Sequence, residues 1–136
     1  MKKLLLIFST ALLLFACSSD DNSGTQVANL TPPDWILGDW RYLVNEGNGS
    51  QLTQNGLNFL FNDVCEVYST NVVCFKSTYG NEPGFSFTEY HKNDSEYKFS
   101  YTVGDQTKTY SFVRLDGNKI RQSEGVDYDN AILEKI

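Results

Sequence analysis

The stretch Glu96-Tyr97-Lys98-Phe99-Ser100-Tyr101-Thr102-Val103 alternates polar and apolar side chains over most of its length. Alternation of this kind is typical of a β-strand with one buried face, because successive side chains of a strand point to opposite sides. The pair Gly104-Asp105 follows and favours a tight turn, after which Tyr110 and Phe112 alternate with their neighbours. The two runs predict an antiparallel hairpin whose one face carries the rings of Tyr97, Phe99, Tyr101, Tyr110 and Phe112.

The same period of two recurs elsewhere in the chain, over residues 40–44, 57–61 and 132–136. Turn-forming clusters separate these runs, and segments with a helical period of useful length are absent. A short helical turn is expected only around Pro33 to Leu37, since proline is tolerated at a helix start. This rhythm predicts an all-β domain over residues 33–136, a small antiparallel up-and-down β-barrel of about seven to nine strands.

The first residues have the pattern of an export signal that ends in a lipobox. Two lysines precede an apolar run over residues 4–15, which is shorter than the roughly 20 residues that span a bilayer. The small residue Ala16 directly precedes Cys17, whose thiol can take a diacylglycerol as a thioether. The sequence therefore predicts a lipoprotein signal peptide over residues 1–16 and a lipid anchor on Cys17, and two or three acyl chains would make that anchor stable.

The next segment is polar and acidic. Residues 18–31 contain no aromatic residue and only three aliphatic ones, too few to offset the entropy of ordering the chain. Residues 17–32 are therefore expected to be the lipidated cysteine followed by a flexible linker. The stretch Ser18-Ser19-Asp20-Asp21 resembles the export signal of Bacteroidetes surface lipoproteins, which implies the outer face of the outer membrane. An ordinary polar spacer on a protein that faces the periplasm is the alternative.

The net charge of the chain restricts the kinds of molecule that the protein is expected to bind. Without residues 1–16 the chain has nine lysines and arginines against seventeen acidic residues, a formal charge of −8. Nucleic acids and anionic lipids both require basic surfaces, so neither is expected as a direct ligand. The expected partners are the membrane, through the lipid on Cys17, and either a small apolar ligand or another protein.

The segment from Pro33 to Trp40 resembles a known family. It is similar to the P-x-W-I-x-G-x-W opening of small lipocalin-like lipoproteins of Bacteroidetes, through Pro33, Trp35, Ile36, Gly38 and Trp40. The likeness extends to that family's last hairpins and covers most of residues 33–136, but Asp39 stands where the family usually carries threonine. The resemblance implies a lipocalin-like barrel in which Trp40 packs into one end of the core. It implies little about activity, because most members are uncharacterised.

Cys65 and Cys74 remain once Cys17 is acylated, an even number in an oxidising compartment. A reversal at Ser69-Thr70 would pair Val67 with Val72 and place the two cysteines opposite each other on one face. Directly opposed residues come close enough for a disulfide. Two free thiols, buried as small apolar groups, are the alternative.

No catalytic constellation stands out. His91 is the only histidine and has no identifiable partner, and Asp127-Tyr128-Asp129 lacks the remaining ligands and the glycine of an EF-hand loop. The chain has no phosphate-binding loop, nucleophile elbow or zinc-protease motif. No enzyme activity, metal site or cofactor is therefore expected.

The aromatic residues instead favour non-covalent binding. In a small barrel Tyr97, Phe99, Tyr101, Tyr110 and Phe112 would face the interior, which either holds a small apolar ligand or glycan or is filled by the rings themselves. The alternative function is a protein–protein interaction module, such as a hydrolase inhibitor or an accessory surface lipoprotein.

Overall fold

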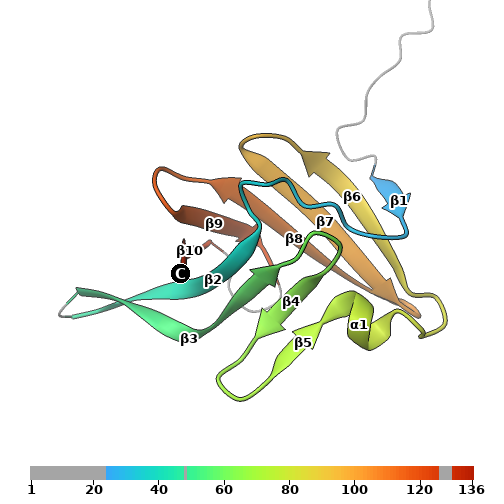
Figure 1. Cartoon of the computed structure of the whole chain (residues 1–136), viewed down its shortest axis with the longest axis horizontal. Coiled ribbons are helices and arrows are strands. Elements are labelled where there is room, and N and C mark those ends of the chain that lie inside the picture. Colours follow the sequence, from blue (N-terminus) through green and yellow to red (C-terminus); the bar gives the residue numbers. More distant parts are fainter. Residues whose placement is uncertain (1–23, 48, 126–129) are drawn as a thin grey trace, which may run out of the picture.

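Ten strands form one antiparallel sheet in the computed structural model, which describes residues 24–47, 49–125 and 130–136 (Figure 1). The elements are β1 (Thr25–Val27), β2 (Gly38–Glu46), β3 (Gly49–Phe59), β4 (Val64–Val67), β5 (Val72–Cys74), α1 (Phe75–Tyr79), β6 (Ser86–Lys92), β7 (Glu96–Val103), β8 (Gln106–Arg114), β9 (Lys119–Glu124) and β10 (Ala131–Lys135). The strands lie in the order β1-β6-β7-β8-β9-β10-β2-β3-β4-β5. The all-β antiparallel class predicted from the period of two is confirmed.

Hydrogen bonds do not close this sheet into a barrel, which corrects the predicted up-and-down barrel. The last strand, β10, pairs with β2, and the sheet curls so that β2–β5 lie below β6–β9 in the view of Figure 1. Closure would require β5 to pair with β6. Instead β5 ends after three residues, at Cys74, where the chain enters α1. The edge of β6 that would have closed the barrel is paired with β1.

The part of the predicted flexible linker that the structure describes, residues 24–32, is ordered. Thr25–Val27 forms β1, and Leu30 is fully buried in the core. Thr31 donates hydrogen bonds from its backbone N and Oγ1 to the Glu89 carboxylate, at 2.9 and 3.1 Å. Composition alone did not predict that this segment is ordered, because composition does not reveal strand pairing or the burial of a single side chain. Burying Leu30 stabilises the fold by roughly 2 kcal/mol. From Gly38 onward the described chain has nine strands, within the predicted range, and β1 is the tenth.

The two halves of the curled sheet pack on each other through aromatic side chains. Phe59 on β3 meets Phe112 on β8 edge-to-face, with ring centroids 5.1 Å apart. Trp40 on β2 is 2% exposed, and its Nε1 donates a hydrogen bond to the Ile36 carbonyl at 2.6 Å. The core-packing role predicted for Trp40 is thereby confirmed. The expected helical turn is a single turn, closed by a 3.0 Å hydrogen bond from Ile36 N to the Pro33 carbonyl.

Candidate functional site

The hairpin of β7 and β8 brings the five predicted ligand-binding residues together. Its register places Tyr97 opposite Phe112, Phe99 opposite Tyr110, and Tyr101 opposite Lys108. Directly opposed residues of a sheet share a face, so the five aromatic side chains lie on one side of the hairpin. The common face expected from the sequence is confirmed.

These rings fill the interior between the two halves of the sheet. Four of the five are at most 1% exposed: Tyr97, Phe99, Tyr110 and Phe112. Phe99 stacks on Tyr110 with centroids 5.3 Å apart, and Phe75 of α1 stacks on Tyr101 at 4.3 Å. The four buried rings therefore offer a ligand almost no surface, whereas Tyr101, which is 5% exposed, lies at the edge of the cluster.

Two carboxylates accept hydrogen bonds from phenols of this cluster. Tyr97 Oη donates to Glu89 at 2.9 Å, and Tyr110 Oη donates to Glu66. Burial first, and then the neighbouring glutamate, raises the pKa of both phenols well above the ordinary value of 10. Burial and the charge of Glu66 also raise the pKa of Tyr101. These hydroxyls are therefore neutral at physiological pH and are unsuited to act as bases.

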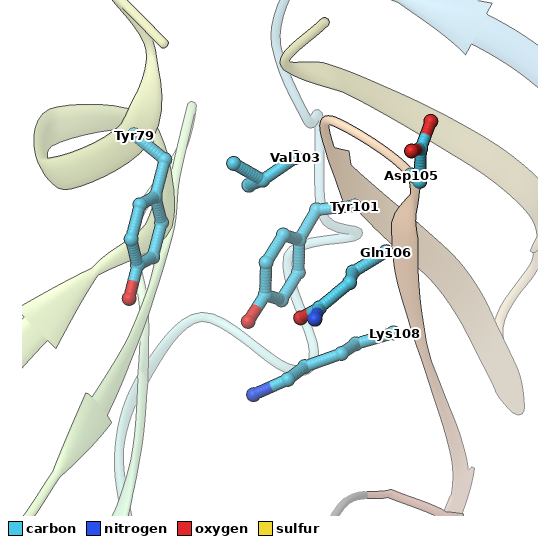
Figure 2. A pocket seen from close by; sticks show the side chains of 6 residues that line it. All are labelled: Tyr79, Tyr101, Val103, Asp105, Gln106 and Lys108. Carbon is cyan, nitrogen blue, oxygen red and sulfur yellow. The ribbon is translucent and has the colours of Figure 1, made fainter.

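A hollow of about 460 Å³ opens where the aromatic cluster ends. Figure 2 shows Tyr79 of α1 on one side and the β7–β8 hairpin on the other. The hairpin contributes Tyr101, Val103, Asp105, Gln106 and Lys108. The rings of Tyr79 and Tyr101 are nearly parallel, with an interplanar angle of 8° and centroids 6.1 Å apart. The hollow therefore combines flat apolar walls with polar groups.

Two contacts hold α1 in place as one wall of this hollow. The Asp63 carboxylate, in a residue that is 3% exposed, accepts hydrogen bonds from Lys76 N at 2.9 Å and Ser77 N at 3.2 Å. These backbone groups belong to the first turn of α1 and have no partner within the helix. Cys74, which directly precedes α1, is bonded to Cys65 on β4. The helix is thus fixed by a buried carboxylate and a covalent bond, in addition to the buried ring of Phe75.

The Cys65–Cys74 disulfide is the pairing favoured from the sequence. The S–S distance is 2.02 Å. β4 and β5 pair so that Cys65 lies opposite Cys74 and Val67 opposite Val72, with the reversal at Ser69-Thr70. The bond lies across this hairpin, as predicted, and it also ties the start of α1, which was not predicted, to the sheet.

His91 does not line this hollow. His91 lies on β6 opposite Lys98, next to an irregularity in the strand register. Cys17 and Asp127–Asp129 lie outside the described residues. Within residues 24–47, 49–125 and 130–136, no group of three His, Cys, Asp or Glu side chains is placed to hold a metal ion. No helix in that part of the chain is long and apolar enough to cross a bilayer.

Only Tyr101 of the six residues that line the hollow was expected at a binding site from the sequence. Lys108 and Tyr79 are the most informative of the five that were missed. Lys108 had a usable signal, because the two-residue turn at Gly104-Asp105 fixes the register and places Lys108 opposite Tyr101. No sequence signal marked Tyr79, because α1 is only five residues long and Asp63, which accepts hydrogen bonds from its first turn, belongs to a distant turn. A tertiary contact of this kind leaves no local pattern.

No known protein family, curated protein or solved structure matches this chain. Its function must therefore be inferred from the chemistry of the hollow and from the features of the sequence.

Proposed function

We propose that the protein is a non-catalytic binding protein that holds a small ligand in the hollow between α1 and the β7–β8 hairpin. The position of the hollow carries the proposal, because it opens at the end of a packed aromatic cluster where Tyr79 and Tyr101 present their rings. The ligand has a flat apolar face, such as an aromatic ring or the apolar face of a sugar ring. It binds at the mouth of the curled sheet, since buried rings occupy the interior.

The size and walls of the hollow suit such a ligand. Its volume of about 460 Å³ lies within the range of small-molecule sites, roughly 300–1,000 Å³. Stacking on an aromatic ring contributes about 0.5–1.5 kcal/mol beyond the burial of area. Val103 extends the apolar wall, while Gln106 and Lys108 supply polar groups that would orient the ligand. The raised pKa of Tyr101 keeps its hydroxyl neutral, which fits binding better than proton abstraction.

The protein is further proposed to act at the outer membrane, held by the lipid on Cys17 and exposed at the cell surface. β1 runs toward the hollow, because Val27 pairs with Phe87 and β6 begins beside the end of β7. The first residue of β1, Thr25, therefore lies at the end of this strand away from the hollow. Thr25 is eight positions after Cys17, and eight residues span at most roughly 28 Å. This arrangement would present the hollow on the side away from the membrane.

The test uses the chain from residue 17 with Cys17→Ser, which keeps all ten described strands, and the neutral dye N-phenyl-1-naphthylamine. Tyr79→Ala removes one wall of the hollow and leaves the buried rings of β7 and β8 in place. We expect the parent chain to bind the dye with a rise in fluorescence, and Tyr79→Ala to bind it about tenfold more weakly.

Phe61→Ala is the matched control, because Phe61 is an aromatic residue that is 75% exposed and does not line the hollow. This variant should bind the dye with the affinity of the parent. Equal affinity in Tyr79→Ala and the parent, or a loss only in Phe61→Ala, would contradict the proposal.

A second hollow, on β2–β4, favours the protein-interaction alternative. Its volume is about 600 Å³, and Leu52, Tyr68 and Ile136 line it with exposed fractions of 45%, 41% and 65%. Exposed apolar side chains that gather in one place often mark interaction sites. A photocrosslinking amino acid at Leu52 that traps another protein in intact cells, while one at Gln106 does not, would favour this second function.

A further inference from the structure

The inward face of the β7–β8 hairpin changes from apolar to polar at Lys108. The inward residues of β8 are Phe112, Tyr110, Lys108 and Gln106, and those opposite them on β7 are Tyr97, Phe99, Tyr101 and Val103. Lys108 is the cation of this face, and it is only partly exposed. Withdrawing an ammonium from water costs free energy unless an anion compensates it.

No carboxylate of the described residues forms an ion pair with Lys108. The ion pairs found there join Arg41 to Asp39, Lys98 to Glu124, and Lys119 to Glu134. Glu66 lies close enough to raise the pKa of Tyr101, but it already accepts hydrogen bonds from Tyr110 and from Tyr68, the latter at 2.8 Å. Among the described residues, the ammonium of Lys108 therefore has no ion-pair partner and can bind an anionic group of a ligand.

Other hydrogen-bond donors gather on the same side of the hollow. Figure 2 shows the hydroxyls of Tyr79 and Tyr101 directed to the side where the ammonium of Lys108 lies. The carboxylate of Asp105 lies at the opposite side and is directed away from the ammonium. An ammonium beside two hydroxyl donors suits a group with several acceptor oxygens and a negative charge.

We propose that the ligand of this hollow carries an anionic group, a carboxylate or sulfonate, attached to its flat ring. This inference rests on the proposed function and names the class of ligand. The ring lies against Tyr101 and Val103, and the anionic group accepts hydrogen bonds from Lys108 and the nearby phenols. Lys108 therefore distinguishes an anionic ligand from a neutral ligand of the same shape.

Two dyes test this distinction. 8-Anilino-1-naphthalenesulfonate and N-phenyl-1-naphthylamine share one ring system and differ in the sulfonate. In the chain that begins at residue 17 with Cys17→Ser, Lys108→Met should weaken binding of the sulfonate dye about tenfold, equivalent to about 1.4 kcal/mol. The same change should alter binding of the neutral dye less than about twofold. Lys108→Arg, which keeps the charge, should restore most of the affinity for the sulfonate.

Lys98→Met is the control, because Lys98 lies on the outer face of β7, where it pairs with Glu124 at 2.9 Å. This variant should bind both dyes like the parent. A salt titration of the parent chain gives a measurement that requires no variant to fold. Salt should weaken binding of the sulfonate dye and leave the neutral dye unchanged, because mobile ions screen a partly exposed charge pair.

The outcomes separate the two proposals. If the parent binds the neutral dye in a Tyr79-dependent way but Lys108→Met does not discriminate between the dyes, the anionic ligand is excluded and the binding site stands. Absence of salt dependence for the sulfonate dye leads to the same conclusion. If the parent binds neither dye, both proposals are wrong.

Discussion

The β7–β8 hairpin and the β4–β5–α1 segment form opposite walls of the hollow, and different forces hold them. The hairpin has strands of eight and nine residues in unbroken register, with inward aromatic side chains that are at most 5% exposed. The opposite segment has strands of four and three residues and a helix of five. Burial of rings stabilises the first wall, whereas in the second a disulfide and the carboxylate of Asp63 supplement the burial of Phe75 and Val64.

This difference bears on the binding site, because each wall supplies part of it. The hairpin provides Tyr101 and Lys108 on a rigid face, and the clamped segment provides Tyr79. Short elements with few buried groups open at a lower free energy than a packed core. The width of the hollow should therefore depend more on the two clamps of α1, the Cys65–Cys74 disulfide and the Asp63 carboxylate, than on the hairpin.

The largest effect is expected from removing a ring of the hairpin wall. Phe99→Ala deletes a fully buried side chain that contacts Tyr110, Phe75 and Tyr97, so it should lower the free energy of unfolding by about 3–5 kcal/mol. Urea unfolding measures this change. Phe61→Ala, at an exposed position, should lie within about 0.5 kcal/mol of the parent. A loss below about 2 kcal/mol at Phe99 would mean that burial does not dominate this wall.

A smaller and more local effect is expected from removing the covalent clamp of the opposite wall. The disulfide closes a loop of about ten residues, so the double variant Cys65→Ala, Cys74→Ala should be about 2–3 kcal/mol less stable in the chain-entropy model. Hydrogen exchange should accelerate over residues 72–79 more than over residues 97–112. Equal acceleration in both regions would show that the two walls form one cooperative unit.

The sequence predicted the hairpin wall because its determinants are local. The alternation around Phe99 defines the buried face, and the Gly104-Asp105 turn, with Gly104 at φ +58°, defines the register. The disulfide was also accessible, because its hairpin has the same two-residue reversal and places Cys65 opposite Cys74. In both cases the residues of a single hairpin are sufficient to predict the register and the residues that face each other.

The features that the sequence did not predict depend on partners far along the chain. β1 is a strand because the edge of β6 is available to pair with it, and Leu30 is ordered because the core accepts it. α1 depends on Asp63. The barrel remains unclosed because α1 follows β5 directly and β1 occupies the edge of β6. The hollow was missed for the same reason, since it requires Tyr79 to face Tyr101, which lies twenty-two positions later in the sequence.

Alkaline pH tests the phenol that joins the two walls. Tyr110 on the hairpin donates to Glu66 on β4, and burial and that carboxylate raise its pKa in the folded chain. Below pH 10 both states keep the proton and stability is unaffected. Above pH 10 the unfolded chain loses the proton while the folded chain retains it, so the free energy of unfolding should fall by about 1.4 kcal/mol per pH unit. Tyr110→Phe should make the slope between pH 10 and 11 shallower by that amount, and an unchanged slope would contradict the assignment.

The smallest effect is expected at the polar clamp of α1. Asp63 Oδ1 accepts from Val64 N and Lys76 N, and Oδ2 accepts from the backbone N and Oγ of Ser77. Asp63→Asn keeps the shape but replaces one acceptor with an NH₂ donor, so in either orientation a donor faces a backbone N–H. Loss of a helix cap costs on the order of 1 kcal/mol, which urea unfolding can resolve.

Asp116→Asn, at an exposed turn position that does not line the hollow, is the control for the lost charge and should leave stability unchanged. If the polar clamp sets the width of the hollow, Asp63→Asn should also weaken binding of N-phenyl-1-naphthylamine about two- to threefold, and Asp116→Asn should not. Because α1 remains tied through Cys74, the effect should stay below that of removing the disulfide. An Asp63→Asn chain with the stability and dye affinity of the parent would assign the clamped wall to the disulfide alone.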